Sequence, residues 1–422
     1  MRHVLVMLGL FALVTLITRS AGAEDLEARA RQLLRSVPLV DGHNDLPWRL
    51  RQKVQGQLAR LDVGKDTAAQ ETLQTDLLRL RRGGVGAQFW SVYVPAEQAP
   101  AQAVVEVLEQ IDLVHRLVQR YPEDLELARG AADVRRCHKR GHIACLIGVE
   151  GGHSVANSLG VLRQLHAVGA RYMTLTHNKD TAWADACSDK PARDGLSPFG
   201  VEIVREMNRL GMLVDLSHVS AATMHDALDV SAAPVIFSHS STRALTEHLR
   251  NVPDDVLRRL PSNGGVVMVT FVPRFVSAEV MAWDAEEEAE KARLGIRLPG
   301  QTALVQEHLE HWRAEHPAPQ ATLQQVADHI EHVVRVAGID HVGLGSDFDG
   351  MRGRTLGLED VSKFPALLAE LLRRGWSDRD VQRLAGLNLL RVLERAEEVA
   401  TELRARTPAE ALFDSTAAIS LH

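Results

Sequence analysis

Seven histidine and carboxylate side chains follow short apolar runs of this sequence, at the points where those runs end. His43 and Asp45 close the run "LVDGHNDLPW" at 39–48. The five others are Glu150, His177, His218, His239 and Asp347. One histidine at such a position is usually a satisfied core or surface side chain, but seven ligand-type residues at one face of a fold are not explained that way. Imidazole and carboxylate groups bind divalent metal ions or transfer protons, so the pattern predicts a metal centre.

The balance of ligands and charges favours two metal ions over one. No Lys or Arg follows these runs to offset the acids, and buried carboxylates need a counter-charge. Three histidines and two acids exceed the four ligands of a tetrahedral zinc ion, whereas two divalent ions that share a carboxylate would use all five. Two such ions, less the charges of Asp45, Glu150 and a bridging hydroxide, leave a positive surplus that suits a developing oxyanion. His43 and Asp45 are two residues apart, so in a strand they face the same side and Asn44 faces the other.

The elements that must position these residues form a regular series. Short apolar, β-branched runs predict eight strands, at 38–45, 85–94, 143–151, 170–178, 211–219, 233–240, 264–271 and 341–350. Amphipathic stretches with helical spacing lie between them, as at 103–121, 199–211 and 323–338. Such alternation predicts a parallel sheet, and eight units predict a (β/α)8 TIM-like barrel with its active site at the C-terminal strand ends. An open doubly wound sheet is the alternative, but no G-x-G-x-x-G turn follows the first strand.

The chain is expected to form one (β/α)8 domain over 24–400, followed by a tail at 401–422. Residues 278–322, between the seventh and eighth strands, are too many for one connecting helix. We expect a helical insertion there, either a solvated appendage or a lid or oligomer contact. The 422 residues are 45% apolar and 24% charged with a net charge of −7, which is a globular composition that gives no support to nucleic-acid binding.

The first 23 residues have the pattern of a secretory signal. Arg2 and His3 precede an apolar run from Val4 to Ile17, and small residues at 21–23 form a cleavage site. The run is shorter than the ~20 residues of a spanning helix, so an uncleaved anchor is the less favoured alternative. We expect an exported, periplasmic or secreted protein that is soluble, with no stable membrane insertion after cleavage. Its three cysteines allow at most one disulfide.

Eight motifs, in order, resemble those of the membrane (renal-type) dipeptidases, zinc metallopeptidases of the amidohydrolase-like barrel group. They are DGHNDLPW, GVEGGHS, LTHN followed by WAD, GLSPFG, DLSHVS, PVIFSHS, RNVPDD and GSDFDG. The likeness runs from about Val37 to about Glu394. It implies two zinc ions. In that family, the residues matching His43 and Asp45 hold the first ion. The matches of His218 and His239 hold the second ion, and that of Glu150 bridges the two.

The same resemblance implies roles for residues that touch the substrate. The family's Arg in the "RNVP" motif binds the terminal carboxylate and corresponds to Arg250. The His of "LTH" contacts the polarised carbonyl oxygen and corresponds to His177, and the Asp of "DFDG" transfers the proton and corresponds to Asp347. Trp90, near the end of the second strand, is expected either to line the substrate pocket or to pack in the barrel.

Together these features predict an exported di-zinc dipeptidase that uses a metal-bridging hydroxide. The resemblance also implies tolerance of a D-residue at the C-terminal position, and a homodimer. The alternatives are an N-acyl-amino-acid deacylase or other amidohydrolase on the same barrel, and a non-catalytic zinc-stabilised binding protein. The sequence departs from the family in "TFVPRF" at 270–275, which lacks a tyrosine-bearing loop, in Asn178, which stands where vertebrate relatives have a Cys, and in its polar C-terminus, which lacks a lipid-anchor signal. Substrate preference therefore stays open.

Four further polar residues are weaker candidates. Asp349 shares strand parity with Asp347 and competes with it for the proton-transfer role. His153 and Asp185 are expected either to orient metal ligands or to hydrogen-bond within loops. Asp215 faces away from His218 and is expected to be structural.

Overall fold

The computed structural model of the chain describes residues 25–68 and 73–414. The predicted signal segment at 1–23 and the end of the predicted tail, from 415 onward, lie outside the described residues. Within the described ranges, no helix is long and apolar enough to cross a membrane. Cys137, Cys145 and Cys187 are all unpaired.

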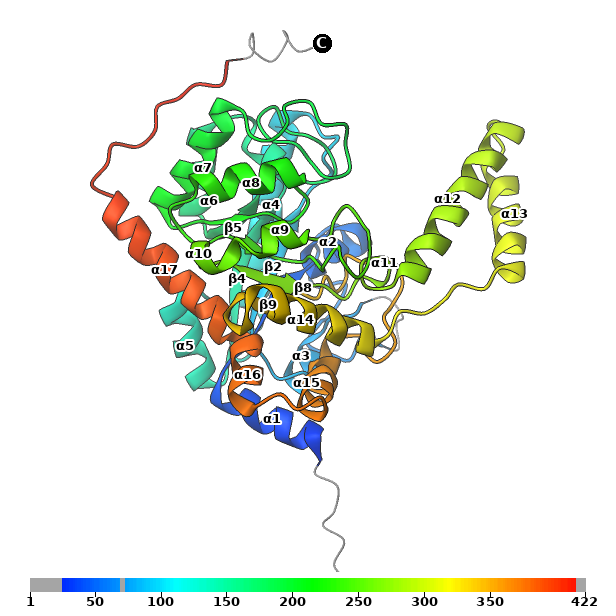
Figure 1. Cartoon of the computed structure of the whole chain (residues 1–422), viewed down its shortest axis with the longest axis horizontal. Coiled ribbons are helices and arrows are strands. Elements are labelled where there is room, and N and C mark those ends of the chain that lie inside the picture. The colour runs from blue at the N-terminus through cyan, green and yellow to red at the C-terminus, as the bar shows by residue number, and fades with distance from the viewer. Residues whose placement is uncertain (1–24, 69–72, 415–422) are drawn as a thin grey trace, which may run out of the picture.

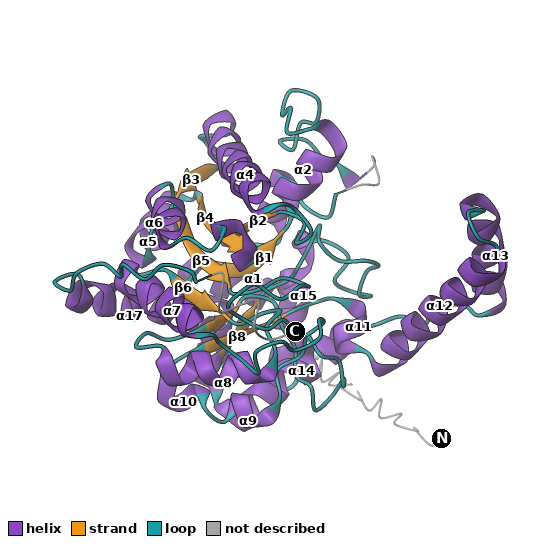
Figure 2. Ribbon diagram, turned by 90° about the horizontal axis from the view of Figure 1, so that it is seen from above, coloured by secondary structure: helices purple, strands orange, loops and turns teal. Residues whose placement is uncertain are grey.

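Eight parallel strands close into a barrel at the centre of the molecule, which confirms the predicted (β/α)8 fold (Figure 2). In ring order they are β1 (Leu39–Asn44), β2 (Val85–Tyr93), β4 (Ile143–Glu150), β5 (Ala170–Thr174), β6 (Leu213–Asp215), β7 (Ile236–Phe237), β8 (Val266–Val269) and β9 (Val342–Leu344). A further strand, β3 (Leu125–Leu127), pairs with the start of β4. The sequence analysis missed β3 because it has only three residues, one of them charged.

Helices surround the barrel on its outside (Figures 1 and 2). The predicted helices at 103–121, 199–211 and 323–338 are observed as α4, α7 and α14. The helices are α1 (Leu26–Ser36), α2 (Leu46–Val54), α3 (Leu77–Arg82), α4 (Pro100–Arg120), α5 (Ala131–Arg140), α6 (Leu159–Ala167), α7 (Pro198–Leu210), α8 (Ala221–Val230), α9 (Asp254–Leu257), α10 (Leu260–Asn263), α11 (Pro273–Val276), α12 (Ala278–Arg297), α13 (Thr302–Glu315), α14 (Leu323–Ala337), α15 (Phe364–Arg373), α16 (Asp378–Gln382) and α17 (Asn388–Leu403).

The strands alternate between two apolar layers, as their period of two requires. Phe89 and Leu146 belong to the cluster that includes the barrel interior, whereas their neighbours Trp90 and Ile147 belong to the layer between strands and helices. All four are at most 1% exposed. Because both faces of each strand are buried, the strands read as continuous apolar runs in the sequence.

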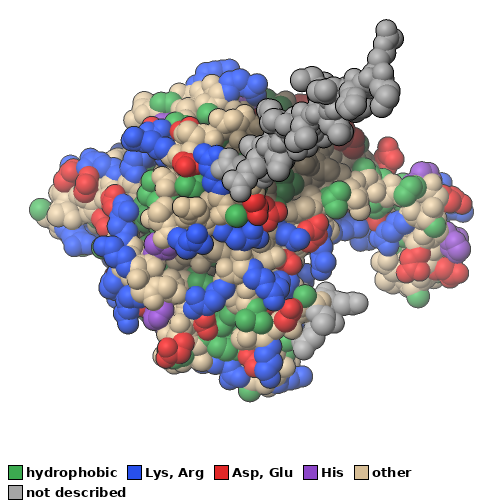
Figure 3. All heavy atoms as spheres, turned by 90° about the horizontal axis from the view of Figure 1, so that it is seen from below, with side chains coloured by type: hydrophobic (Ala, Val, Ile, Leu, Met, Phe, Trp, Pro, Cys, Tyr) green, Lys and Arg blue, Asp and Glu red, His purple; other side chains and the backbone are tan. Residues whose placement is uncertain are grey.

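Helices α12 and α13 form an arm, residues 278–315, that projects away from the barrel (Figure 1). The arm follows β8 in the sequence and starts on the side of the barrel where that strand ends. Its helices enclose a small apolar cluster of their own, made by Leu294, Val305 and Leu309. Basic and acidic side chains lie next to one another on the arm and on the barrel face seen in Figure 3. The arm is thus a largely solvated hairpin attached near the rim of the barrel.

Candidate active site at the barrel mouth

The seven predicted ligand-type residues meet at the C-terminal ends of the strands. All except His43 line one cavity of about 380 Å³, and His43 lies directly beneath it in contact with the other ligands. Five strands, β5 to β9, end two to six residues earlier than predicted. His177, His218 and Asp347 each follow the last strand residue by three positions, because the chain leaves the sheet there and turns over the barrel mouth.

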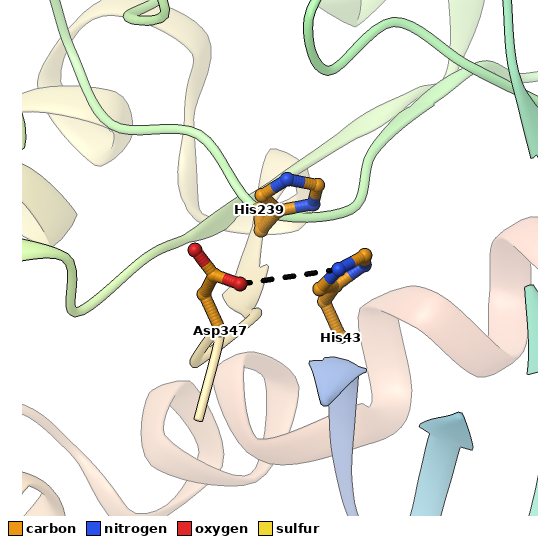
Figure 4. Close-up of side chains that lie close together, drawn as sticks. All are labelled: His43, His239 and Asp347. Carbon is orange, nitrogen blue, oxygen red and sulfur yellow. Dashed lines mark ion pairs between the residues drawn. The ribbon is translucent and has the colours of Figure 1, made fainter. Parts of the chain in front are cut away.

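One half of the cluster is built around His43. Its Nε2 atom lies 3.3 Å from Asp45 Oδ2 and 3.5 Å from Glu150 Oε2. It lies 3.9 Å from Asp347 Oδ1, and Figure 4 shows this pair next to His239. His43 is fully buried, and its Nε2 has no hydrogen-bond partner. His43 and Asp45 do face the same side, as their spacing predicts, while the Asn44 amide donates to Thr75 Oγ1 instead.

The other half of the cluster is built around two facing imidazoles. His218 Nε2 lies 3.0 Å from His239 Nε2 and 3.0 Å from Glu150 Oε1, and His239 Nε2 lies 3.5 Å from the same oxygen. The two oxygens of Glu150 therefore face different halves: Oε2 faces His43 and Oε1 faces the two other rings. Glu150 is the last residue of β4, and it joins ligands from opposite sides of the barrel.

Buried hydroxyl groups fix the orientation of these ligands. The Tyr172 hydroxyl lies 2.8 Å from His43 Nδ1 and 3.3 Å from the carbonyl oxygen of Gly42, so it can accept from the ring and donate to the backbone. Ser238 Oγ lies 2.8 Å from His239 Nδ1, and Ser91 donates to Glu150 Oε2 at 3.0 Å. With Nδ1 as the donor, each ring presents the lone pair of Nε2 to the cluster. The sequence analysis missed these three positioning residues.

Two fully buried aspartates connect the ends of neighbouring strands below the cluster. Asp41 accepts from the backbone and side chain of Ser346, and Asp215 accepts from the backbone amides of Ser217 and Ser238. Burial raises the pKa of each carboxyl to about 6, against the lowering effect of these hydrogen bonds. Asp215 is thus placed as predicted, in a structural position. Asp41 has the same strand parity as His43, which is the signal that could have identified it.

The electrostatics of the cluster differ among its imidazoles. Burial lowers the pKa of His43, but Tyr172, Glu150 and Asp45 outweigh it and hold that pKa well above normal. Burial, and secondarily the nearby positive groups, lower the pKa values of His218 and His239 well below the usual range, so both rings are neutral. Burial raises the pKa of Glu150, but His43 and His218 outweigh it and hold that pKa well below normal. Burial and the carboxylate of Asp45 raise the pKa of Asp347 well above normal. One carboxyl of the cluster is therefore poised to carry a proton.

These donors fit divalent metal ions. Three overlapping groups of ligand atoms each lie within 4.8 Å of one another: His43 with His239 and Asp347, Glu150 with His218 and His239, and His43 with Asp45 and Glu150. A buried nitrogen without a partner and two neutral imidazole nitrogens facing each other are poorly satisfied by hydrogen bonds alone. Cations that accept nitrogen and oxygen ligands satisfy both. Glu150, His43 and His239 each belong to two of the groups, as expected where two ion sites lie side by side.

The backbone that carries the ligands is strained at two of them. His218 and Asp347 have φ values of 74° and 66°, in the left-handed region that non-glycine residues seldom adopt. Such conformations cluster at functional sites, because the surrounding structure must hold them. A Cβ atom at Gly350 would lie 2.1 Å from Asp45 Oδ2 and 2.5 Å from Asp347 Oδ1. The glycine of "GSDFDG" therefore allows the loop to approach both carboxylates.

Arg250 and His177 stand on the cavity wall beside the cluster. Arg250 is 6% exposed and donates to Ser240 Oγ and to the carbonyl oxygen of His239. Among the described residues it has no carboxylate within ion-pair distance, so a buried guanidinium faces the cavity without an anion. The His177 ring packs on Tyr93, with centroids 4.7 Å apart, and its Nε2 lies 3.6 Å from Glu150 Oε1. Burial lowers the pKa of His177, which leaves a neutral ring.

The remaining candidates lie outside the cluster. Trp90 is fully buried between the barrel and the helices and does not line the cavity, which favours its packing alternative. Asp349 accepts from the backbone amide of Gln74, and His153 Nε2 lies 3.1 Å from the carbonyl oxygen of Val94. Asp185 accepts from the amides of a nearby loop. For His153 and Asp185, loop hydrogen bonding is therefore the arrangement observed.

Several cavity residues were not identified from the sequence. Trp48 and Tyr93 line the cavity and meet edge to face, with ring centroids 4.9 Å apart. Phe275 and Arg274, from the segment after β8, line the opposite wall. Trp48 follows Asp45 by three residues, and this spacing is the only sequence signal for any of the four.

Comparison with known proteins gives one consistent family. A sequence model described as membrane dipeptidase (peptidase family M19) matches residues 27–407. The dipeptidase verJ of Clonostachys rogersoniana is 42% identical over 400 residues, which cover 92% of each chain. The crystal structure of the probable dipeptidase PvdM from Pseudomonas aeruginosa is similar with a TM-score of 0.77 and 25% identity, over 89% of this chain and 99% of that one. A metallopeptidase from Rhodobacter sphaeroides, liganded with a phosphinate mimic of L-Ala-D-Ala, has a TM-score of 0.70 and 24% identity, over 85% and 99%.

Proposed function

Because the chain belongs to the membrane dipeptidase family, peptidase family M19, and is thus a hydrolase of the metallodipeptidase type, we propose that it cleaves dipeptides with two zinc ions bridged by Glu150. His43 and Asp45 would hold one ion, and His218 and His239 the other. Such ions supply Lewis acidity and an activated water. The observation that carries the proposal is the placement of the two Glu150 oxygens, one toward each histidine group.

Arg250 would select the substrate by its C-terminal carboxylate. Its planar guanidinium matches a carboxylate with two parallel hydrogen bonds, and Ser240 and the His239 carbonyl hold it from behind. Because Arg250 lies directly beside His239, the carboxylate it binds is one residue beyond the bond that faces the cluster. This geometry supports dipeptides as the substrate class.

His177 and Asp347 would act on the scissile bond itself. A neutral His177 offers its Nε2–H to the carbonyl oxygen, which gains negative charge in the transition state. Asp347 lies on the His43 side of the cavity with a raised pKa, so its carboxyl can accept a proton and return it to the leaving amine. Trp48 and Tyr93 would close the cavity on the side of the N-terminal residue.

A panel of matched substrates tests this function. Amino-acid release is measured from L-Ala-L-Ala, from L-Ala-D-Ala and from the N-acetyl form of the first. Release from the free dipeptides only is the expected result, and hydrolysis of both L,L and L,D forms supports tolerance of a C-terminal D-residue. Cleavage of the N-acetyl form alone would favour the alternative, an N-acyl-amino-acid deacylase on the same barrel.

Export and dimer formation complete the proposal. The segment 1–23 would direct export and be cleaved before Glu24. Terminal sequencing of the protein recovered from outside the cytoplasm should begin at Glu24, and an intact N-terminus would contradict cleavage. Family membership suggests a homodimer, which light scattering of the purified protein tests directly.

A further inference from the structure

The catalytic cavity is lined by two sets of charged groups, carboxylates and guanidiniums, and the surface formed by the second set is called the guanidinium wall. All its lining carboxylates, Asp45, Glu150 and Asp347, belong to the proposed metal cluster. All its lining guanidiniums stand apart from that cluster, and they are Arg250, Arg274 and Arg352. Divalent ions would neutralise the carboxylates, so the guanidinium wall is left with an excess of positive charge. The proposed function uses Arg250 alone.

Arg274, like Arg250, forms no ion pair with a carboxylate of the described residues, and the proposed function gives it no role. Its Cζ atom lies 5.4 Å from the ring centroid of Phe275, and that of Arg250 lies 5.3 Å from the same ring. No hydrogen bond or ion pair joins Arg274 to another residue of 25–68 or 73–414. Arg352, in contrast, forms an ion pair with Glu287 of the arm, and its side chain is 62% exposed.

A partly buried imidazole, that of His248, lies beside Arg250 and Arg274. The His248 ring packs on Phe275 with centroids 4.4 Å apart, and its Nδ1 accepts from the backbone amide of Arg250. Burial first, and then Arg274 and Arg250, lower the pKa of His248 to about 3. His248 therefore stays neutral and adds no charge of its own to this wall.

Arg274 also stands where the catalytic cavity meets a second one. This neighbouring cavity, of about 600 Å³, shares Asn178, Arg250 and Arg274 with the first. Its other charged residues are Lys179, Glu247, Asp284 and Glu288. Burial raises the pKa of Asp284, and the charge of Arg274 lowers it in part. The two side chains lie beyond ion-pair distance. A substrate side chain that extends past Arg250 toward the second cavity would therefore meet Arg274, which lines both cavities.

We propose that Arg274 determines specificity by binding the side-chain carboxylate of an acidic residue at the C-terminal position of the dipeptide. This inference rests on the proposed function: Arg250 takes the main-chain carboxylate, and Arg274, on the same Phe275 ring, takes the second carboxylate of the same residue. Phe275 holds both guanidiniums by cation–π contact, which limits the entropy lost when they bind. The enzyme then prefers dipeptides that end in Asp or Glu.

The test compares Ala-Glu with Ala-Gln, which differ only in charge, each in its L,L and L,D form. Wild-type kcat/KM for Ala-Glu should exceed that for Ala-Gln by about tenfold or more, the effect of one charge-assisted pair. The R274Q variant should reduce this ratio to nearly one, chiefly through KM, and R274K should give an intermediate ratio. The matched control R352Q should keep the wild-type ratio, because the arm already pairs that guanidinium.

Three results would overturn the inference: equal wild-type values for the two dipeptides, an unchanged ratio in R274Q, or a preference for Glu-Ala over Gln-Ala in place of the C-terminal one. Cleavage of Ala-Gln without a preference for Ala-Glu would refute the role of Arg274 and leave the dipeptidase intact. If neither dipeptide is cleaved, the proposed function fails, and calorimetric binding to the zinc-loaded protein decides the inference. Tighter binding of Ala-Glu that R274Q abolishes supports it, and equal binding refutes it.

Discussion

The cluster at the barrel mouth and the arm at 278–315 are built in opposite ways. The metal ligands of the cluster are buried, and groups from other strands hold two of them, His43 through Tyr172 of β5 and Glu150 through Ser91 of β2. The arm has an apolar centre of three buried leucine and valine side chains, and Glu287 ties it to Arg313 within the arm and to Arg352 at the cavity rim. A change in the cluster should therefore alter chemistry, and a change in the arm should stay local.

The largest effect is expected from Glu150→Gln. A neutral amide cannot bridge two cations, so kcat/KM for a good dipeptide should fall by about a thousandfold or more. Glu202→Gln on the surface of α7 is the control and should retain full activity. Activity of E150Q within tenfold of wild type, with normal metal content, would show that Glu150 is only structural.

A smaller effect is expected from Arg250→Lys. An ammonium keeps the charge but cannot form two parallel hydrogen bonds with a carboxylate, so KM should rise by about 10- to 100-fold. Steady-state kinetics with one dipeptide separate KM from kcat. If kcat falls instead and KM stays constant, Arg250 does not bind the substrate carboxylate in the ground state.

Tyr172→Phe should affect the cluster indirectly, because Tyr172 contacts the ligand His43 and not a metal ion. The change leaves the ring in the barrel interior but removes the hydroxyl that orients His43, so zinc affinity should fall by about tenfold. Competition with a chromophoric chelator measures this affinity. Phe89→Leu, at a ring that contacts Tyr172 without touching the cluster, is the control for altered packing. Equal zinc affinities in wild type and Y172F would contradict the orienting role.

The smallest effect on catalysis is expected from Leu309→Ala in the arm. Leu309 is 1% exposed, and its truncation should cost roughly 2–3 kcal/mol of local stability. Hydrogen exchange should therefore speed up over 278–315 but not in β1 or β4, with kcat/KM within about twofold of wild type. Loss of most activity would mean that the arm takes part in the reaction.

The sequence predicted the cluster far better than its surroundings, for physical reasons. With too few cysteines for a thiolate site, the metal ligands of this barrel are expected to be His, Asp or Glu at strand ends, so His43 and Glu150 stand out in apolar runs. Tyr172 and Ser238 orient them through side chains that are also common in ordinary cores, and only the structure shows what they contact. Arg274 gives no periodic signal either, because it lies in α11, a helix of four residues that is too short to show helical spacing in the sequence.

Strand ends were predicted less well than strand order. The strand before His177 was expected to continue to 178 but ends at Thr174, since the chain leaves the sheet there and turns over the barrel mouth. Apolar content marks burial but does not distinguish a sheet residue from a buried loop residue. The prediction of eight alternating strand and helix units is unaffected, because it depends on the number of apolar runs and not on where each run ends.

The central claim is a site for two metal ions that Glu150 joins, and stepwise zinc loading of the metal-free protein tests it most directly. Elemental analysis and L-Ala-L-Ala hydrolysis are followed together as zinc is added to wild type and to E150Q. The account predicts about two zinc ions per wild-type chain, full activity only near the second equivalent, and loss of tight loading in E150Q. Full activity with one zinc ion per chain, or two tightly bound ions in an inactive wild-type protein, would contradict it.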